Sequence, residues 1–103
     1  MPAARPLTWD ELNAVPDTVI LDVRSPEEFA AGHVPNATNV PLDQLPRRLD
    51  EVGTGLVVCV CTHGGRRSQG AAASLAEVGV DAAWLVGGWE GYRSESAGRA
   101  SCG

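Results

Sequence analysis

The sequence has no long hydrophobic run, few cysteines and no excess of positive charge, and each shortage excludes a class of protein. No apolar stretch approaches the roughly 20 residues that cross a bilayer, so we expect no membrane association. The net charge is −5 and the basic residues form no stripe, which argues against nucleic-acid binding. The amino terminus shows no basic segment followed by an apolar core, so we expect no signal peptide and a cytoplasmic protein.

The cysteines are Cys59, Cys61 and Cys102, too few for a disulfide framework. Their spacing with the two histidines matches no zinc motif, so no metal site is expected, and no organic cofactor is implied. A catalytic thiol in a reducing compartment is the better interpretation. Cys102 is interpreted as a bystander in the tail, with a resolving or sulfur-accepting thiol as the alternative.

Alternating hydrophobic and turn signals predict one α/β domain over residues 1–103. Apolar, β-branched runs predict strands, and N-cap, proline and glycine signals predict helices between them. We therefore expect a central parallel sheet of about five short strands, covered by helices on both faces. The core spans about 7–92, with a loose start at 1–5 and a flexible tail at 94–103. The located strands are 18–23, 38–40, 56–61 and 82–86, and the located helices are 8–15, 26–32, 41–52 (which Pro46 can break), 68–78 and 89–92.

The side chains best suited to catalysis or anion binding are concentrated between the strand at 56–61 and the helix at 68–78. A cysteine at the carboxyl end of a strand opens a glycine-rich loop that leads to a helix amino terminus, where unpaired N–H groups favour negative charge. That field lowers the pKa of a thiol, and arginines at the end of the loop can hold an oxyanion. The pattern predicts a nucleophilic sulfur in an anion cradle, suited to sulfur transfer or to phosphoryl and arsenate chemistry. The segment is Cys61-Thr62-His63-Gly64-Gly65-Arg66-Arg67-Ser68.

Side chains outside the loop are expected to support it. Arg24 follows its own strand and reaches the same sheet edge, where we expect Asp22 to pair with it and brace the loop rather than catalyse. Cys59 lies deeper on the same strand side as Cys61 and is interpreted as core packing. His63 is either an acid or anion-binding group or an exposed loop histidine. The acids at 27–28 are explained by the start of a helix.

Several further motifs, in order along the chain, resemble a single-domain rhodanese. With the loop they extend over about residues 7–92. The resemblance implies a rhodanese-like fold and a catalytic Cys61 that carries a persulfide from a small anionic donor, such as thiosulfate, to cyanide, a thiol or a sulfur-accepting protein. It makes 62–68 the anion-binding segment. The motifs are Asp22-Val23-Arg24, Glu28-Phe29, Gly32-His33-Val34-Pro35-Asn36-Ala37, Asn39-Val40-Pro41 and Leu85-Val86-Gly87-Gly88-Trp89.

The loop departs from the rhodanese pattern in its length. The family usually carries arginine five positions after the cysteine, followed directly by serine or threonine, whereas Arg67 stands between Arg66 and Ser68. If Arg67-Ser68 is the usual pair, the loop is one residue longer and resembles rhodanese-fold phosphatases and arsenate reductases. We predict a thiosulfate sulfurtransferase, with those two activities, a non-catalytic module or a sulfur carrier as alternatives. The sequence leaves open which arginine faces the anion.

Overall fold

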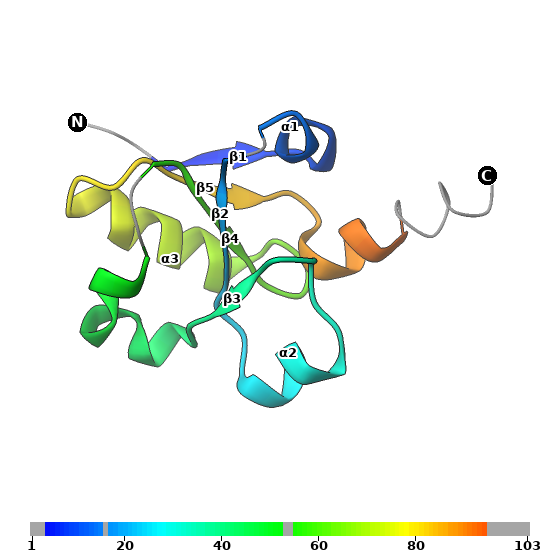
Figure 1. Ribbon diagram of the computed structural model, residues 1–103, viewed down its shortest axis with the longest axis horizontal. Coiled ribbons are helices and arrows are strands. Elements are labelled where there is room, and N and C mark those ends of the chain that lie inside the picture. Colours follow the sequence, from blue (N-terminus) through cyan, green and yellow to red (C-terminus); the bar gives the residue numbers. More distant parts are fainter. Residues whose placement is uncertain (1–3, 16, 53–54, 95–103) are drawn as a thin grey trace.

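Five parallel strands form a single sheet in the computed structural model, which describes residues 4–15, 17–52 and 55–94. The strands are β1 (Arg5–Leu7), β2 (Val19–Asp22), β3 (Thr38–Asn39), β4 (Val57–Val60) and β5 (Ala82–Leu85). Their order across the sheet is β1-β5-β4-β2-β3, and every neighbouring pair is parallel (Figure 1). The predicted α/β fold with a parallel sheet of about five strands is confirmed.

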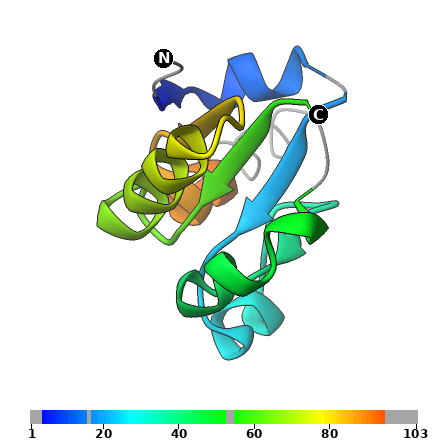
Figure 2. The same cartoon turned by 90° about the vertical axis from the view of Figure 1, so that its left-hand side faces the viewer.

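Helices cover both faces of this sheet. The turns η1 (Leu42–Arg47) and η2 (Leu49–Glu51), both 3-10 helices, lie with α3 (Arg66–Glu77) on one face (Figure 2). On the other face lie α1 (Trp9–Asn13) and a helical segment at 88–94, while α2 (Pro26–Ala31) follows β2 (Figure 1). Within the described residues, no helix is long and apolar enough to span a membrane.

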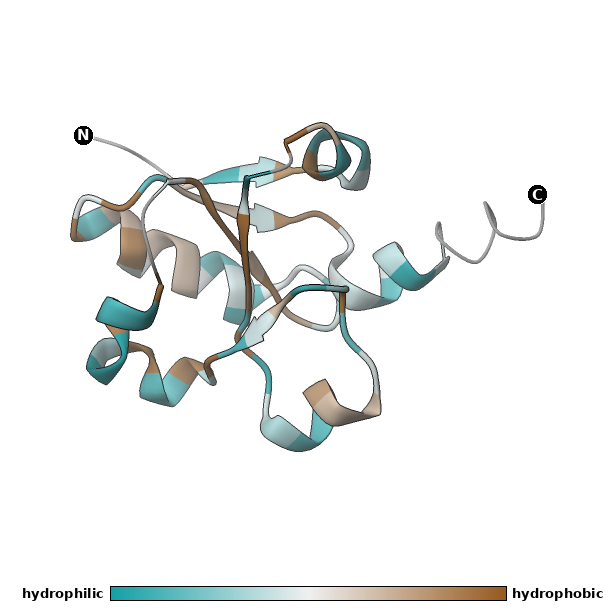
Figure 3. Cartoon of the chain, in the orientation of Figure 1, coloured by the Kyte–Doolittle hydropathy of each residue, from teal (hydrophilic) through white to brown (hydrophobic). Residues whose placement is uncertain are grey.

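The central strand β4 is buried on both faces and divides the core into two clusters. Val57 and Cys59 pack under α3, whereas Val58 and Val60 pack on the α1 side. The most hydrophobic segments gather in these central strands (Figure 3). Because successive side chains of a strand point to opposite faces, Cys61 continues the first row and belongs to the cluster under α3.

The start of the chain differs from the expectation. The sequence predicts a loose segment at 1–5, but Arg5–Leu7 pairs with β5 as an edge strand. An edge strand tolerates Pro6, whose missing N–H would break the ladder of a central strand. The guanidinium of Arg5 also donates to Asp81 at 2.8 Å. Residues 1–3 and 95–103, which include Cys102 and most of the expected tail, lie outside the described residues.

Two helix boundaries also differ. The helix expected over 41–52 is a pair of 3-10 helices, and the interruption falls at Arg48, with φ of −123°, rather than at Pro46, which lies inside η1. The helix expected to begin at Ser68 begins at Arg66, directly after its N-cap residue Gly65. Both arginines of the loop segment therefore belong to the first turn of α3.

Candidate active site

Cys61 lies directly after β4, at the carboxyl edge of the sheet, and is 3% exposed. The loop that follows folds back over its sulfur before α3 begins. The N–H of Gly65 donates to Cys61 Sγ at 3.2 Å, and Ser68 Oγ lies 3.2 Å from the same sulfur. Two groups of the loop and the first turn of α3 therefore converge on one thiol.

These hydrogen bonds decide how the thiol ionises. Burial is the largest single influence and raises the pKa of Cys61, but the Ser68 hydroxyl and the N–H groups of Ser68, Gly65 and Gly64 together outweigh it. The pKa of Cys61 is consequently lowered from its ordinary value. The neighbouring Cys59, fully buried in β4, has its pKa raised to about 12 by burial and then by the nearby charge of Cys61. Cys61 is thus the thiol prepared to ionise, and Cys59 stays a neutral core residue.

Two glycines allow the loop to pack against the turn after β5. Gly64 and Gly88 have φ of 74° and 59°, in the left-handed region that favours glycine. A Cβ on Gly64 would lie 2.7 Å from the carbonyl oxygen of Leu85, and a Cβ on Gly88 would collide with that of Cys61. The N–H of Trp89 donates to the same Cys61 oxygen at 2.8 Å. The backbone at Cys61 is therefore held by the turn as well as by β4.

The two arginines of the segment have different environments. Arg67 donates from Nη1 to Glu28 Oε1 at 2.8 Å and from Nη2 to Glu28 Oε2 at 3.2 Å, and Nη2 also donates to Thr62 Oγ1 at 3.1 Å. Arg66 is exposed and makes no hydrogen bond or ion pair within the described residues. Ser68 contacts the cysteine, and Arg67 directly precedes it and contacts Thr62 of the loop. Arg67-Ser68 is therefore the pair that faces the loop from the first turn of α3, which corresponds to the longer of the two spacings.

Asp22 and Arg24 form a buried ion pair beside this loop. The guanidinium donates to the carboxylate from Nε at 3.0 and 3.2 Å and from Nη2 at 2.8 Å. Nη2 also donates to the carbonyl of Gly32 at 2.7 Å, and the guanidinium lies 5.9 Å from the ring centroid of Trp89. The pair therefore ties the end of β2 to the end of α2 and to the turn that holds Cys61, which is a bracing position.

Comparison with known proteins gives the family. The model of the rhodanese-like domain matches residues 8–95. The chain belongs to the rhodanese-like family. Similar solved structures include a rhodanese-related protein from Thermoplasma volcanium (TM-score 0.81, 26% identity, 88% of this chain and 92% of that chain covered). Others are a rhodanese-like domain protein from Staphylococcus aureus (0.78, 32%, 85% and 90%) and a rhodanese homologue from Thermus thermophilus (0.69, 29%, 84% and 98%).

Glu28 is the residue at this rhodanese-like site that sequence analysis did not place there. Its Oε1 accepts from the N–H of Ser25 at 3.1 Å, which is the helix-start role expected for it. The same carboxylate also reaches Arg67, 39 residues further along the chain. The pKa of Glu28 is lowered to about 2. The largest cause is the hydrogen bond from Arg67, followed by the hydrogen bond from the backbone of Ser25. No local sequence pattern predicts such a contact, because it depends on the side-by-side placement of β2 and β4.

A cavity of about 360 Å³ opens beside Arg67, between the end of β2 and η1. Apolar side chains make up much of its wall, and the two arginines contribute the cationic part. It offers space next to the loop for a group attached to a bound anion. The lining residues are Val23, Arg24, Ser25, Pro41, Leu42, Asp43 and Arg67.

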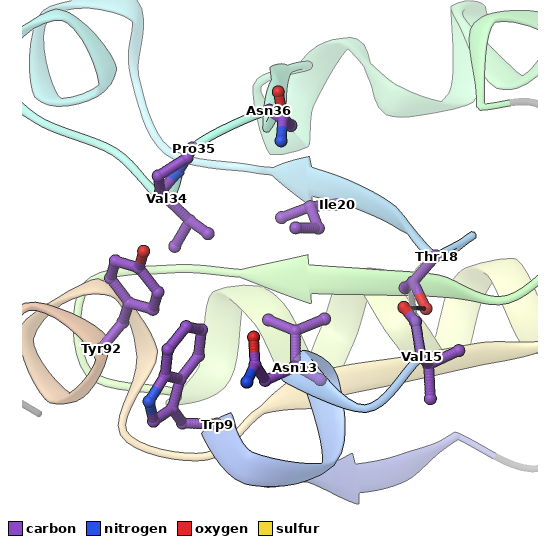
Figure 4. A pocket seen from close by; sticks show the side chains of 10 residues that line it. Trp9, Asn13, Val15, Thr18, Ile20, Val34, Pro35, Asn36 and Tyr92 are labelled. Atoms are coloured by element: carbon purple, nitrogen blue, oxygen red, sulfur yellow. Dashed lines mark hydrogen bonds between the residues drawn. The ribbon is translucent and has the colours of Figure 1, made fainter. Parts of the chain in front are cut away.

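Two other features lie apart from Cys61. His63 is exposed and makes no hydrogen bond within the described residues, which favours the interpretation as an exposed loop histidine. A groove of about 390 Å³ lies on the α1 side, where the ring of Tyr92 meets Trp9 edge-on at 4.4 Å between centroids (Figure 4). No residue of the 61–68 segment lines that groove. Among the described residues, no cluster of His, Cys, Asp and Glu could hold a metal ion.

Proposed function

We propose that this rhodanese-like domain is a sulfurtransferase that moves a sulfane sulfur through a persulfide on Cys61. The observation that supports it most directly is the environment of the thiol. Cys61 is buried, yet its pKa is lowered because Ser68 and the loop N–H groups stabilise the thiolate against the cost of burial. A thiolate stabilised in this way forms at lower pH than that of an ordinary cysteine and is a nucleophile, and the same donors can stabilise the charge of a persulfide.

The reaction consists of two displacements. The Cys61 thiolate attacks the outer sulfur of a donor such as thiosulfate, the donor S–S bond breaks, and its electron pair leaves with sulfite. The persulfide that remains carries its negative charge on the outer sulfur, which is bonded to the Sγ that the Gly65 N–H and the Ser68 hydroxyl contact. An acceptor, either cyanide or a thiol on a small molecule or a protein, then takes the outer sulfur and restores the thiolate. Both leaving groups depart as anions, so neither step needs a general acid.

The longer loop supports a second candidate, a phosphatase or arsenate reductase. Its spacing resembles that of rhodanese-fold phosphatases and arsenate reductases, and that resemblance implies a cradle wide enough for a tetrahedral anion. A phosphatase also benefits from a proton donor for its leaving group. Glu28, whose pKa is lowered to about 2 chiefly by Arg67, is ionised at neutral pH. This carboxylate beside the loop is thus a poor proton donor, which favours sulfur transfer.

Turnover assays separate these functions. Purified protein is given thiosulfate or an organic persulfide with cyanide, and thiocyanate is measured; aryl phosphates, and arsenate with a thiol reductant, are assayed in parallel. Cys59→Ala is the matched control for Cys61→Ala, because both residues lie on the same side of one chain segment. We expect thiocyanate above the uncatalysed rate from the parent protein and Cys59→Ala, and none above that rate from Cys61→Ala. Phosphate or arsenate turnover without sulfur transfer would overturn the proposal.

A further inference from the structure

The arginine that belongs to the cradle is already neutralised by a carboxylate. Glu28 faces both terminal nitrogens of Arg67, at 2.8 and 3.2 Å. The hydroxyl of Thr62 completes the arrangement, since it donates to Glu28 Oε2 at 3.2 Å and accepts from Arg67 Nη2 at 3.1 Å. Three of the five N–H donors of this guanidinium are therefore engaged before any ligand binds.

The electrostatic surroundings of the thiolate follow from this pairing. The charges of Arg67 and Cys61 interact, which is a minor cause, after Glu28, of the raised pKa of Arg67. The other arginine packed around the cradle, Arg24, is matched in the same way by Asp22. Each of these two arginines is accompanied by a carboxylate, so the two pairs contribute little net positive charge next to Cys61. Arg66, which has no ion pair within the described residues, is exposed to solvent, where its charge is screened. The loop N–H groups are left to stabilise an anion.

Building on the proposed sulfurtransferase function, we propose that Glu28 sets the donor preference by neutralising Arg67. The site then favours an organic persulfide over thiosulfate. Thiosulfate carries two negative charges and has to approach a thiolate that is itself negative, which costs energy without an uncompensated cation. An organic persulfide carries at most one. The cavity beside Arg67, with Val23, Pro41 and Leu42 in its wall, offers space for the organic substituent.

The chemical step with this donor balances. The Cys61 thiolate attacks the outer sulfur of R–S–SH, the donor S–S bond breaks, and its electron pair leaves with R–S⁻. The hydrogen stays on the transferred sulfur, and Cys61 becomes a persulfide. Glu28 acts in this scheme through Arg67 and touches no reacting atom, so it is a positioning residue that controls charge.

Glu28→Gln isolates the charge from the other roles of this residue. Glutamine at the third helical position preserves a capping box with Ser25. Its side-chain oxygen can still accept a hydrogen bond from Arg67. Glu27→Gln is the matched control, because it removes the same charge from the adjacent position of α2, where Glu27 is exposed and makes no hydrogen bond or ion pair within the described residues.

Steady-state kinetics with two donors test the proposal. The donors are thiosulfate and 2-hydroxyethyl persulfide, with cyanide as acceptor. We expect the parent protein to have the higher kcat/KM for the persulfide. Glu28→Gln should lower the KM for thiosulfate by roughly three- to tenfold at low salt, with the advantage shrinking as salt is added. Glu27→Gln should leave both donors unchanged. An unchanged or raised thiosulfate KM in Glu28→Gln, or equal shifts for both donors, would overturn the proposal.

A second readout does not depend on sulfur transfer. In a Cys102→Ser background, the rate of alkylation by neutral iodoacetamide is measured against pH. Glu28→Gln should move the Cys61 profile to lower pH, because Arg67 is then uncompensated, while Glu27→Gln should not. A shifted profile without turnover of either donor would refute the sulfurtransferase function but retain the charge role of Glu28. Turnover with neither a KM change nor a shifted profile would refute the role of Glu28 alone.

Discussion

Removing the hydroxyl of Ser68 should raise the pKa of Cys61 and slow its reactions as a nucleophile. Ser68 Oγ is buried, 3.2 Å from Cys61 Sγ and 3.3 Å from the carbonyl oxygen of Gly65. Its single proton therefore has two acceptors. When Cys61 is a thiol, the S–H donates to Oγ and the hydroxyl donates to Gly65. When Cys61 ionises, the hydroxyl can turn to the thiolate, and Ser68→Ala removes that option.

The size of the effect follows from this exchange. A hydrogen bond to a charged group contributes roughly 1.5–3 kcal/mol, and the neutral bond to Gly65 that is given up contributes about 1 kcal/mol. The difference is roughly 0.5–2 kcal/mol, and one pKa unit corresponds to about 1.4 kcal/mol. Ser68→Ala should therefore raise the pKa of Cys61 by about one unit. Persulfide formation below that pKa should slow by up to about tenfold, because the thiolate is the reacting form.

The assay is the pH dependence of Cys61 alkylation by iodoacetamide. A Cys102→Ser background removes the thiol outside the described residues, and Cys59 stays protonated because its pKa is raised to about 12. Ser74→Ala is the matched control, since Ser74 lies on the exposed side of α3. We expect the Ser68→Ala profile to move to higher pH and the Ser74→Ala profile to match the parent. Coincidence of the Ser68→Ala and parent profiles would refute the assigned role of the hydroxyl.

Four further substitutions, at the two arginines, Cys59 and Glu28, have defined outcomes. Arg67→Gln should raise the KM for thiosulfate by about tenfold, because it leaves the Glu28 carboxylate uncompensated beside the cradle. Substitution of the exposed arginine, Arg66→Gln, should change this KM by less than about twofold. Equal effects of the two substitutions in steady-state kinetics would contradict this prediction. Cys59→Ala should lower the free energy of unfolding by about 1 kcal/mol in urea titrations, because it creates a small cavity in β4, and should retain persulfide formation. The depressed pKa of Glu28 stabilises the fold above the unfolded value near 4.5, and this contribution is lost as pH falls toward about 2. Glu28→Gln should reduce the change in the free energy of unfolding across that pH window by about 1 kcal/mol in urea titrations. The effect is small because the ion pair is partly exposed. An unaltered pH dependence would argue against a stabilising ion pair between Glu28 and Arg67.

The strands that the sequence predicts are those with a strong local pattern. The central strands β2 and β4 are apolar and β-branched and are bounded by turn signals, so their position follows from burial on both faces. The sequence does not predict the edge strand β1, because its three residues include arginine and proline and show no hydrophobic pattern. Its pairing with β5 depends on tertiary contacts rather than on local sequence. The capping boxes at Thr8 and Ser25 are formed by residues three positions apart, so they depend on local sequence alone.

The candidate site also combines features that follow from local sequence with features that depend on the fold. The place of Cys61 before a glycine-rich loop and a helix is local information, and the structure brings Gly65 and Ser68 to its sulfur as that pattern implies. The sequence does not predict which of Arg66 and Arg67 faces the loop. It depends on where α3 begins, since each helical residue turns the side-chain direction by about 100° and adjacent side chains face different surroundings. The link between Glu28 and Arg67 depends on the strand order, which no local pattern contains.

The most direct test of a persulfide on Cys61 is the intact mass of the purified protein after exposure to a sulfur donor. The protein is treated with thiosulfate or 2-hydroxyethyl persulfide, with and without subsequent cyanide, beside Cys61→Ala. We predict a gain of one sulfur atom that cyanide removes and that Cys61→Ala does not show. No gain with either donor, or an equal gain in Cys61→Ala, would contradict the account.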